Sequence, residues 1–150
     1  ANISRSRDIE VEFRDGKLEQ LKESTQNSLS LSIYSNNRYS NHSTNDIRKE
    51  SLDKFIQEAV AMTKYLSEDP YRSLPDPKYY QDQKDIDLHI NDPHYENISS
   101  EKRVDIARET ERIASAQSDK IISCTSGYSD SYVESTKVNS NGFEGDMEGT

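Results

Sequence analysis

A short alternating run near the start of the chain limits most strongly what it can fold into. Ile9, Val11 and Phe13 alternate with charged residues, which places these three apolar side chains on one face of an extended strand. Asp15-Gly16 follows, and this pair readily adopts the positive φ angles of a two-residue type I′ hairpin turn. The pattern predicts an antiparallel hairpin.

The hairpin is expected to extend into a meander. The returning segment is less regular, because Leu18 and Leu21 are three positions apart, so we expect one bulge or twist between them. Residues 29–33 alternate again between apolar side chains and serines, and Asn36-Asn37 supplies a second turn. Together these runs predict four antiparallel strands over about residues 8–43, with one apolar face.

An apolar stripe in the next segment predicts a helix over about residues 48–66 that covers this face. The stripe repeats at intervals of three and four residues, the spacing of one helix face: Leu52, Phe55, Ile56, Ala59, Val60, Thr63 and Leu66. The main contact with the sheet is expected from its first five members.

Periodicity disappears over residues 67–98, which hold all four prolines and four tyrosines. A loop of this length is uncommon in a compact domain unless it is functional or wraps another element. Ser99 or Ser100 is expected to cap a second helix over about residues 99–118. Two further strands, residues 120–126 and 131–139, are expected to follow. The predicted class is α+β: an antiparallel meander with two helices packed on one side, then the strands at about 120–139.

Composition limits the partners. Net charge is −9, and the 19 Lys and Arg residues are scattered, so the phosphate neutralisation that dominates nucleic-acid affinity has no source. There is no apolar run near 20 residues and a single cysteine. We expect a cytoplasmic protein that binds neither nucleic acid nor membrane. Only 31% of residues are hydrophobic, so the core is thin for this length, through either partial disorder or apolar surface that lies elsewhere in a longer polypeptide. The clear periodic patterns favour the longer polypeptide.

Few residues suggest chemistry. His89, Asp92 and His94 could converge on a metal, but Pro93 rules out a regular helical spacing, so loop histidines without a ligand are the competing interpretation. A structural role is favoured for His42. We predict no catalytic, cofactor-binding or metal-binding residue in this segment.

Three further features have simpler explanations. Cys124 follows Ile121-Ile122, where a buried free thiol is favoured over a nucleophile because no His or Lys flanks it to activate the thiol. Asp15-Gly16 and Asn141-Gly142 lack the glycine spacing and the following Lys of a phosphate loop, so both are interpreted as turns.

Four strings, in this order and spacing, resemble the N-terminal part of the TldD/PmbA family, known as modulators of DNA gyrase and as metallopeptidases. The loop after the long helix is closer to the PmbA branch. The strings are "EFRDGKLEQLKES" at 12–24, "STNDI" at 43–47, "SEDPYRSLPD" at 67–76 and "VNSNGFEGDMEGT" at 138–150.

The resemblance implies that these residues are an interior fragment. A helix and a first strand would precede them, and the Asn-Ser-Asn-Gly-Phe stretch would lead into a larger sheet. Zinc catalysis by a His-Glu-x-x-x-His helix and a later Cys would lie beyond residue 150, so the catalytic C-terminal part would be absent. Relatives carry Ser or Thr where this chain has Arg48, so either Asp46 caps the long helix or its first turn frays.

Two functions remain open. The resemblance implies the N-terminal, non-catalytic portion of a TldD/PmbA-like metallopeptidase, which shapes a dimer and a peptide chamber for proteolysis. Zinc would then belong to the intact dimer, and the partners would be a TldD-like subunit or a second copy, with unfolded peptide as substrate. The alternative is a non-enzymatic module that binds a partner or an extended peptide through its sheet edges.

Overall fold

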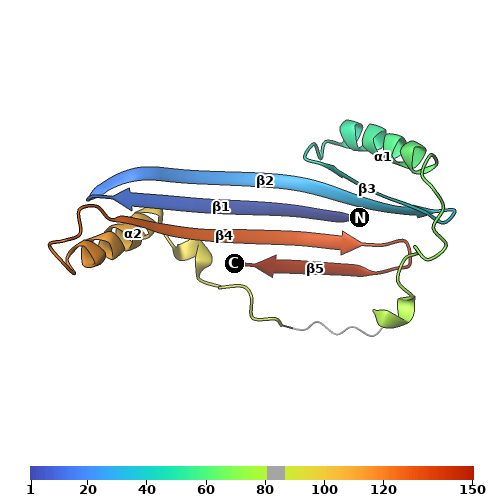
Figure 1. Ribbon diagram of the computed structural model, residues 1–150. Coiled ribbons are helices and arrows are strands. Elements are labelled where there is room, and N and C mark those ends of the chain that lie inside the picture. The colour runs from blue at the N-terminus through green and yellow to red at the C-terminus, as the bar shows by residue number, and fades with distance from the viewer. Residues whose placement is uncertain (81–86) are drawn as a thin grey trace. The chain divides into compact units, whose positions relative to one another are not determined.

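The computed structural model describes residues 1–80 and 87–150. Its sheet has the strand order β3-β2-β1-β4-β5 (Figure 1), with β1 at Asn2–Arg14, β2 at Lys17–Ser35, β3 at Arg38–Thr44, β4 at Thr125–Val138 and β5 at Glu144–Gly149. The helices of the described residues are α1 (Lys49–Thr63), α2 (Ser100–Ser115), η1 (Pro77–Tyr79) and η2 (Tyr95–Asn97). The predicted α+β class, with an antiparallel sheet and two α-helices, is confirmed.

The number of strands differs from the prediction. The segments expected as two strands at 17–25 and 29–33 form the single strand β2, so three strands, and not four, precede α1. The expected turn at 127–130 lies inside β4, and residues 121–124 belong to no strand. Serine, threonine and asparagine interrupt the apolar pattern at these places, but no residue of β2 has a positive φ, so the polar residues continue the strand without a turn.

Both predicted hairpin turns are confirmed. Asp15 and Gly16 have φ angles of 48° and 74°, and Asn36 and Asn37 have 49° and 57°. A positive φ at both central residues defines the type I′ turn, whose twist matches that of the strands it joins.

The strand that returns from the first turn contains an irregularity. The Asp15-Gly16 turn pairs Arg14 with Lys17, which sets even-numbered residues of β1 opposite odd-numbered residues of β2. Nevertheless, Lys22 Nζ lies 3.3 Å from Glu10 Oε2, a pair of even-numbered residues. Because paired side chains share a face, β2 must hold one extra residue between Lys17 and Lys22, in the stretch where the sequence predicts a bulge or twist.

The described residues divide into two compact units, which are considered separately. Unit 1 comprises Ala1–Arg5, Gln26–Leu88 and Glu134–Met147. Unit 2 comprises Ser6–Thr25, His89–Val133 and Glu148–Thr150.

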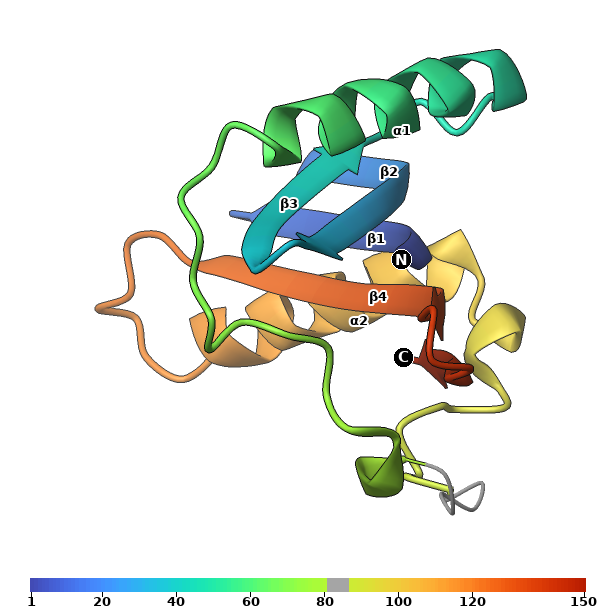
Figure 2. The same cartoon turned by 90° about the vertical axis from the view of Figure 1, so that its right-hand side faces the viewer.

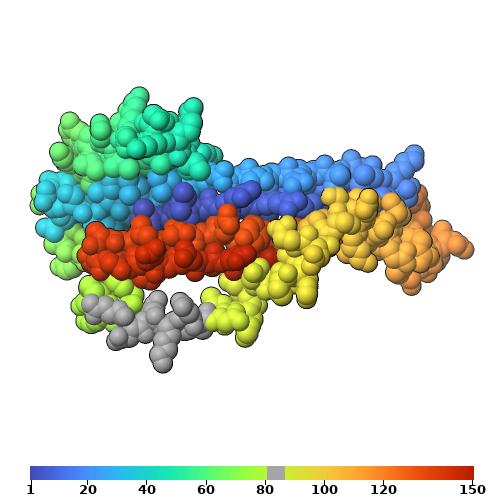
Figure 3. Space-filling model, turned by 180° about the vertical axis from the view of Figure 1, so that it is seen from behind, coloured from blue at the N-terminus to red at the C-terminus, as the bar shows by residue number. Residues whose placement is uncertain are grey.

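In unit 1, α1 lies against β3 (Figures 2 and 3). The contact contains a buried polar link: Thr63 Oγ1 donates to the Ala59 carbonyl oxygen at 2.7 Å and lies 2.5 Å from Ser40 Oγ of β3. Beside it, the His42 ring meets Phe55 edge-on, with the ring centroids 6.4 Å apart. These contacts hold one face of α1 on the sheet.

The helix covers the sheet with fewer residues than expected. Ala59 is buried, and Leu52 and Phe55 are half-buried. Ile56 and Val60 are 42% and 41% exposed, so the prediction that they belong to the main helix–sheet contact is wrong.

The hydrophobic core of unit 2 forms where the first alternating run meets α2. Ile9, Val11 and Phe13 of β1 are buried against Ala107 of α2, as the alternation predicts. Ser99 caps this helix, since its side chain accepts a hydrogen bond from the Lys102 N–H. This confirms one of the two expected caps. Burial of three apolar side chains of this size stabilises the unit by several kcal/mol, roughly 2 kcal/mol each.

Candidate functional site

A buried polar cluster joins α2 to β4 in unit 2. Arg103 Nε donates to Asp130 Oδ2 at 2.6 Å, and their side chains are only 3% and 12% exposed. The other carboxylate oxygen of Asp130 accepts from the Tyr95 hydroxyl at 3.0 Å, and Oδ2 also accepts from the Tyr128 hydroxyl at 2.9 Å. Arg103 also donates through Nη1 to the Ile98 carbonyl oxygen and lies over the Tyr95 ring.

The electrostatics of this cluster hold its charges in place. Burial alone would raise the pKa of Asp130, but hydrogen bonds from Arg103, Tyr128 and Tyr95 outweigh it and keep that pKa below its usual value. Burial, together with the hydrogen bond to Asp130, raises the pKa of Tyr95 and of Tyr128. Both tyrosines therefore stay protonated donors and Asp130 stays an acceptor at neutral pH. A charge so fully satisfied positions its neighbours and is poorly suited to proton transfer.

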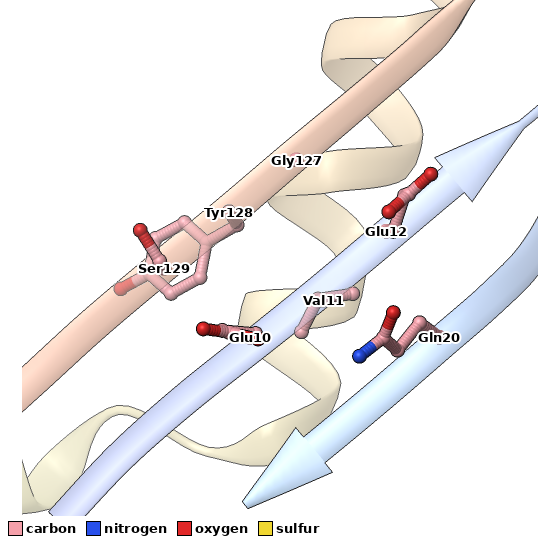
Figure 4. A pocket seen from close by; sticks show the side chains of 7 residues that line it. All are labelled: Glu10, Val11, Glu12, Gln20, Gly127, Tyr128 and Ser129. Atoms are coloured by element: carbon pink, nitrogen blue, oxygen red, sulfur yellow. The ribbon is translucent and has the colours of Figure 1, made fainter.

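An open hollow of about 410 Å³ lies on the face of unit 2 that α2 does not cover (Figure 4). Glu10 and Glu12 of β1 and Gln20 of β2 present their side chains there, with α2 behind the strands. Lys22 already pairs with Glu10. The hollow holds two carboxylates, and Lys22 pairs with one of them, so the expected attraction for a cation is weak.

A larger groove of about 890 Å³ lies in unit 1. It is lined by the start of β1, residues 30–34 of β2 and residues 137–140, together with Leu74, Pro75, Tyr79, Tyr80 and Phe143. Four of these lining residues are aromatic: Tyr34, Tyr79, Tyr80 and Phe143. Tyr80 meets Phe143 edge-on at a centroid distance of 5.4 Å. Part of the long loop, residues 74–80, therefore lies against the sheet, consistent with the expectation that the loop is functional or wraps another element.

The structure does not assemble a metal site from the histidines considered in the sequence. Asp92 Oδ1 accepts the backbone N–H of His94 at 2.8 Å, which makes it part of a turn. His89 and His94 are exposed. Over residues 1–80 and 87–150, no group of three or more His, Cys, Asp and Glu side chains could hold a metal ion. These residues therefore do not fit a catalytic zinc, which normally takes three protein ligands.

The other candidates lie apart from one another. His42 is half-buried between β3 and α1, and its Nε2 has no hydrogen-bond partner within the described residues. Cys124 is half-buried in the segment before β4, outside the strand expected for it. Its backbone N–H donates to Asp15 Oδ1 at 3.0 Å, which ties this segment to the hairpin turn and lowers the pKa of Asp15. Gly142 has a φ of 89° and forms a turn with Asn139.

The buried cluster was not predicted from the sequence. Arg103 lies four residues before Ala107 on the inner face of α2, a place where a long charged side chain is usually assigned to solvent. Two features of the sequence hinted at buried polar residues here. Arg103 lies on the same helix face as Ala107, and Asp130 lies between two tyrosines that are each two residues away, the spacing of one strand face. Neither fact shows that the two charges meet.

Two family models match the chain. Residues 2–63 match the model described as PmbA/TldA metallopeptidase domain 1, and residues 93–150 match the PmbA/TldA metallopeptidase central domain. A curated relative, Metalloprotease PmbA from Escherichia coli O157:H7, is 28% identical over 126 residues, which is 83% of this chain and 27% of the relative.

Solved structures share the fold. A proposed modulator of DNA gyrase from Bacteroides thetaiotaomicron has a TM-score of 0.90 at 30% identity, over 98% of this chain and 33% of that one. TldE from Thermococcus kodakarensis has a TM-score of 0.72 at 22% identity, over 99% of this chain and 33% of its own, and supports the fold alone. The chain thus spans between 27% and 33% of the length of these proteins. No described helix is long and apolar enough to cross a membrane.

Proposed function

Because the chain belongs to the TldD/PmbA metallopeptidase family, we propose that its residues form an N-terminal, non-catalytic portion of such an enzyme. The observation that carries the proposal is the match of the two family models to residues 2–63 and 93–150. In this role the chain shapes the dimer and one wall of the chamber in which peptides are cleaved, and the catalytic metal, with zinc as the proposed ion, is held by residues beyond Thr150.

The hydrogen bonds of the buried and turn-forming carboxylates support a structural role. Two hydrogen-bonded carboxylates hold elements together: Asp130 fixes α2 to β4, and Asp15 fixes residues 123–124 to the hairpin. A domain that lines a chamber must keep its strands rigid while chemistry occurs elsewhere, and buried, fully paired polar clusters provide that rigidity. We place the intact protein in the cytoplasm, paired with itself or with a TldD-like subunit and acting on unfolded peptide.

Peptide cleavage by the intact polypeptide tests this function. The polypeptide is assayed alone and mixed with a TldD-like partner, against an unstructured peptide and against a folded protein as the control substrate. We expect hydrolysis of the unstructured peptide only when at least one subunit carries the His-Glu-x-x-x-His motif, and its loss when that subunit's glutamate is changed to glutamine. Hydrolysis by pairs that lack the motif would overturn the proposal.

A second candidate function has its own observation. The strands β3 and β5 are the two edges of the sheet, and an edge strand can add a strand from a partner. Against it, β5 alternates Glu144, Asp146 and Glu148, and such charges disfavour edge pairing. A stable 1:1 complex with a partner that survives loss of the motif, without any hydrolysis, would favour this interaction module over the enzyme portion.

A further inference from the structure

We propose that Asn141 is a site of spontaneous deamidation, where an asparagine becomes aspartate or isoaspartate without the help of an enzyme. Asn141 lies in the turn that joins β4 to β5 in unit 1 (Figure 1), and it precedes Gly142 in the only Asn-Gly pair of the sequence. This pair has no part in the proposed function, so the inference stands independently of it. The argument comes from the different environments of two asparagines in one turn.

The first of these asparagines holds the turn together. The Gly142 N–H donates to the Asn139 carbonyl oxygen at 3.3 Å, which closes a four-residue β-turn with asparagine first and glycine last. The Oδ1 atom of Asn139 also accepts the N–H groups of Asn141 at 2.9 Å and of Phe143 at 3.0 Å. The side-chain amide of Asn139 is therefore engaged by the fold.

The second asparagine is free to react. The side chain of Asn141 is exposed and has no hydrogen-bond partner within the described residues. Gly142 has a φ of 89°, and a Cβ placed on it would meet no atom within 4 Å, so nothing hinders approach to its nitrogen. The hydrogen bond from that nitrogen, at 3.3 Å, is longer than the usual upper limit of about 3.2 Å, so its proton is weakly held.

This arrangement suits the chemistry of deamidation. The Gly142 nitrogen gives its proton to solvent and attacks Cγ of Asn141, so a nitrogen–carbon bond forms and a five-membered succinimide ring closes. The bond between Cγ and Nδ2 breaks, and Nδ2 takes up a proton from solvent and leaves as ammonia. Water then opens the ring at either carbonyl, which gives aspartate or isoaspartate. The net change consumes a water molecule, releases ammonia and leaves a new carboxylate.

Either product disturbs the turn. Aspartate adds a negative charge directly before β5, in a chain whose net charge is already −9. Isoaspartate also lengthens the backbone by a methylene group between Asn139 and Phe143, where the Asn139 N–H donates to the Phe143 carbonyl oxygen at 3.0 Å. The Phe143 ring meets Tyr80 edge-on at 5.4 Å, and both rings line the groove of unit 1. The modification therefore acts on the lining of the groove.

Ageing of the intact polypeptide, followed by mass spectrometry of its peptides, tests the site. We expect Asn141 to deamidate in the folded protein within about threefold of its rate in guanidinium chloride, because the fold does not hold its side chain. Asn139 is the matched internal control, and its reaction should be at least about tenfold slower in the folded protein than in the unfolded chain. Asn141→Gln should abolish the reaction in this turn, because the longer side chain would have to close a six-membered ring.

Hydrogen exchange of the aged protein tests the effect on the turn. The Asn139 and Phe143 amides should exchange at least about tenfold faster after deamidation, whereas Ile33 and Ser40, which are partners in the β2–β3 pairing, should be unchanged. A methyltransferase that recognises isoaspartate, supplied with S-adenosylmethionine, separates the two products. Fresh Asn141→Asp protein gives the effect of the charge alone.

Three results would overturn the inference. The first is deamidation of Asn141 only in the unfolded chain, and the second is equal protection of Asn141 and Asn139 by the fold. The third is unchanged exchange of the Asn139 and Phe143 amides once deamidation at Asn141 is complete, which would remove the proposed effect on the turn. Peptide hydrolysis by the freshly purified protein is measured separately, and its absence would count against the proposed function alone.

Discussion

Replacing Asp130 by Asn should destabilise the protein by about 3–5 kcal/mol, because the change leaves the Arg103 guanidinium buried without its counter-ion. Arg103 is 3% exposed and lies 2.6 Å from the carboxylate, so water cannot replace the lost charge. The amide also has one acceptor oxygen in place of two, and three donors now share it: Arg103, Tyr95 and Tyr128. The expected loss is a large share of the 5–15 kcal/mol typical of a domain.

Urea unfolding, followed by the fluorescence of the nine tyrosines, measures this loss. Asp105→Asn is the matched control, since Asp105 also pairs with an arginine, Arg108, at 2.7 Å, but with side chains 58% and 56% exposed. An exposed pair contributes at most about 1 kcal/mol. The two substitutions are chemically identical, so the difference between them isolates burial.

The double variant Arg103→Met with Asp130→Leu adds a second check. It removes both charges, so its loss of unfolding free energy should be smaller than the sum of the losses measured for Arg103→Met alone and Asp130→Leu alone. Equal losses for Asp130→Asn and Asp105→Asn, or strict additivity in the double variant, would refute the interpretation of the cluster as a buried, mutually satisfied ion pair.

Three further predictions concern stability. The folded-state pKa of Asp130 lies below its usual value, so the stability that its charged form contributes is complete above the unfolded pKa of about 3.9. This stability is lost as pH falls through the folded pKa, so the urea midpoint should fall more steeply below about pH 4 in the wild type than in Asp130→Asn. Thr63→Val should cost about 1–3 kcal/mol, because the buried Ser40 hydroxyl loses its partner, and adding Ser40→Ala should recover part of the loss in the same unfolding assay. Phe55→Ala should cost about 1–3 kcal/mol, less than the 3–5 kcal/mol of a fully buried phenylalanine, because Phe55 is half-buried. Ile56→Ala should cost under about 1 kcal/mol because Ile56 is exposed, and a larger loss for Ile56→Ala than for Phe55→Ala would mean that α1 is rotated on the sheet.

The local signals in the sequence predicted local structure well. Asp15-Gly16 and Asn36-Asn37 formed the expected turns, because a positive φ is a property of the turn residues themselves. The alternation through Val11 predicted the buried face of β1 for the same reason: the two-residue period of a strand needs no knowledge of its partner.

Features that depend on distant partners were not predictable in the same way. The apolar stripe of α1 identified the residues able to face a sheet, but which of them do so depends on how the helix packs, and Ile56 and Val60 stay exposed. The polar residues within β2 were interpreted as a break between two strands. Most of β2 is exposed, and an exposed strand can contain polar residues without ending. The Arg103–Asp130 pair joins residues 27 positions apart, so it exists only once α2 packs on β4.

The metal content of the intact polypeptide and of the 150-residue chain tests the central claim most directly. Both are purified without chelator, and bound zinc per chain is measured by elemental analysis after removal of loosely held metal. A catalytic zinc normally needs three protein ligands, and no such group exists in the described residues. We predict no stoichiometric zinc on the 150-residue chain and about one zinc in the intact assembly for each subunit that carries the His-Glu-x-x-x-His motif. One zinc bound by the 150 residues themselves would contradict the account.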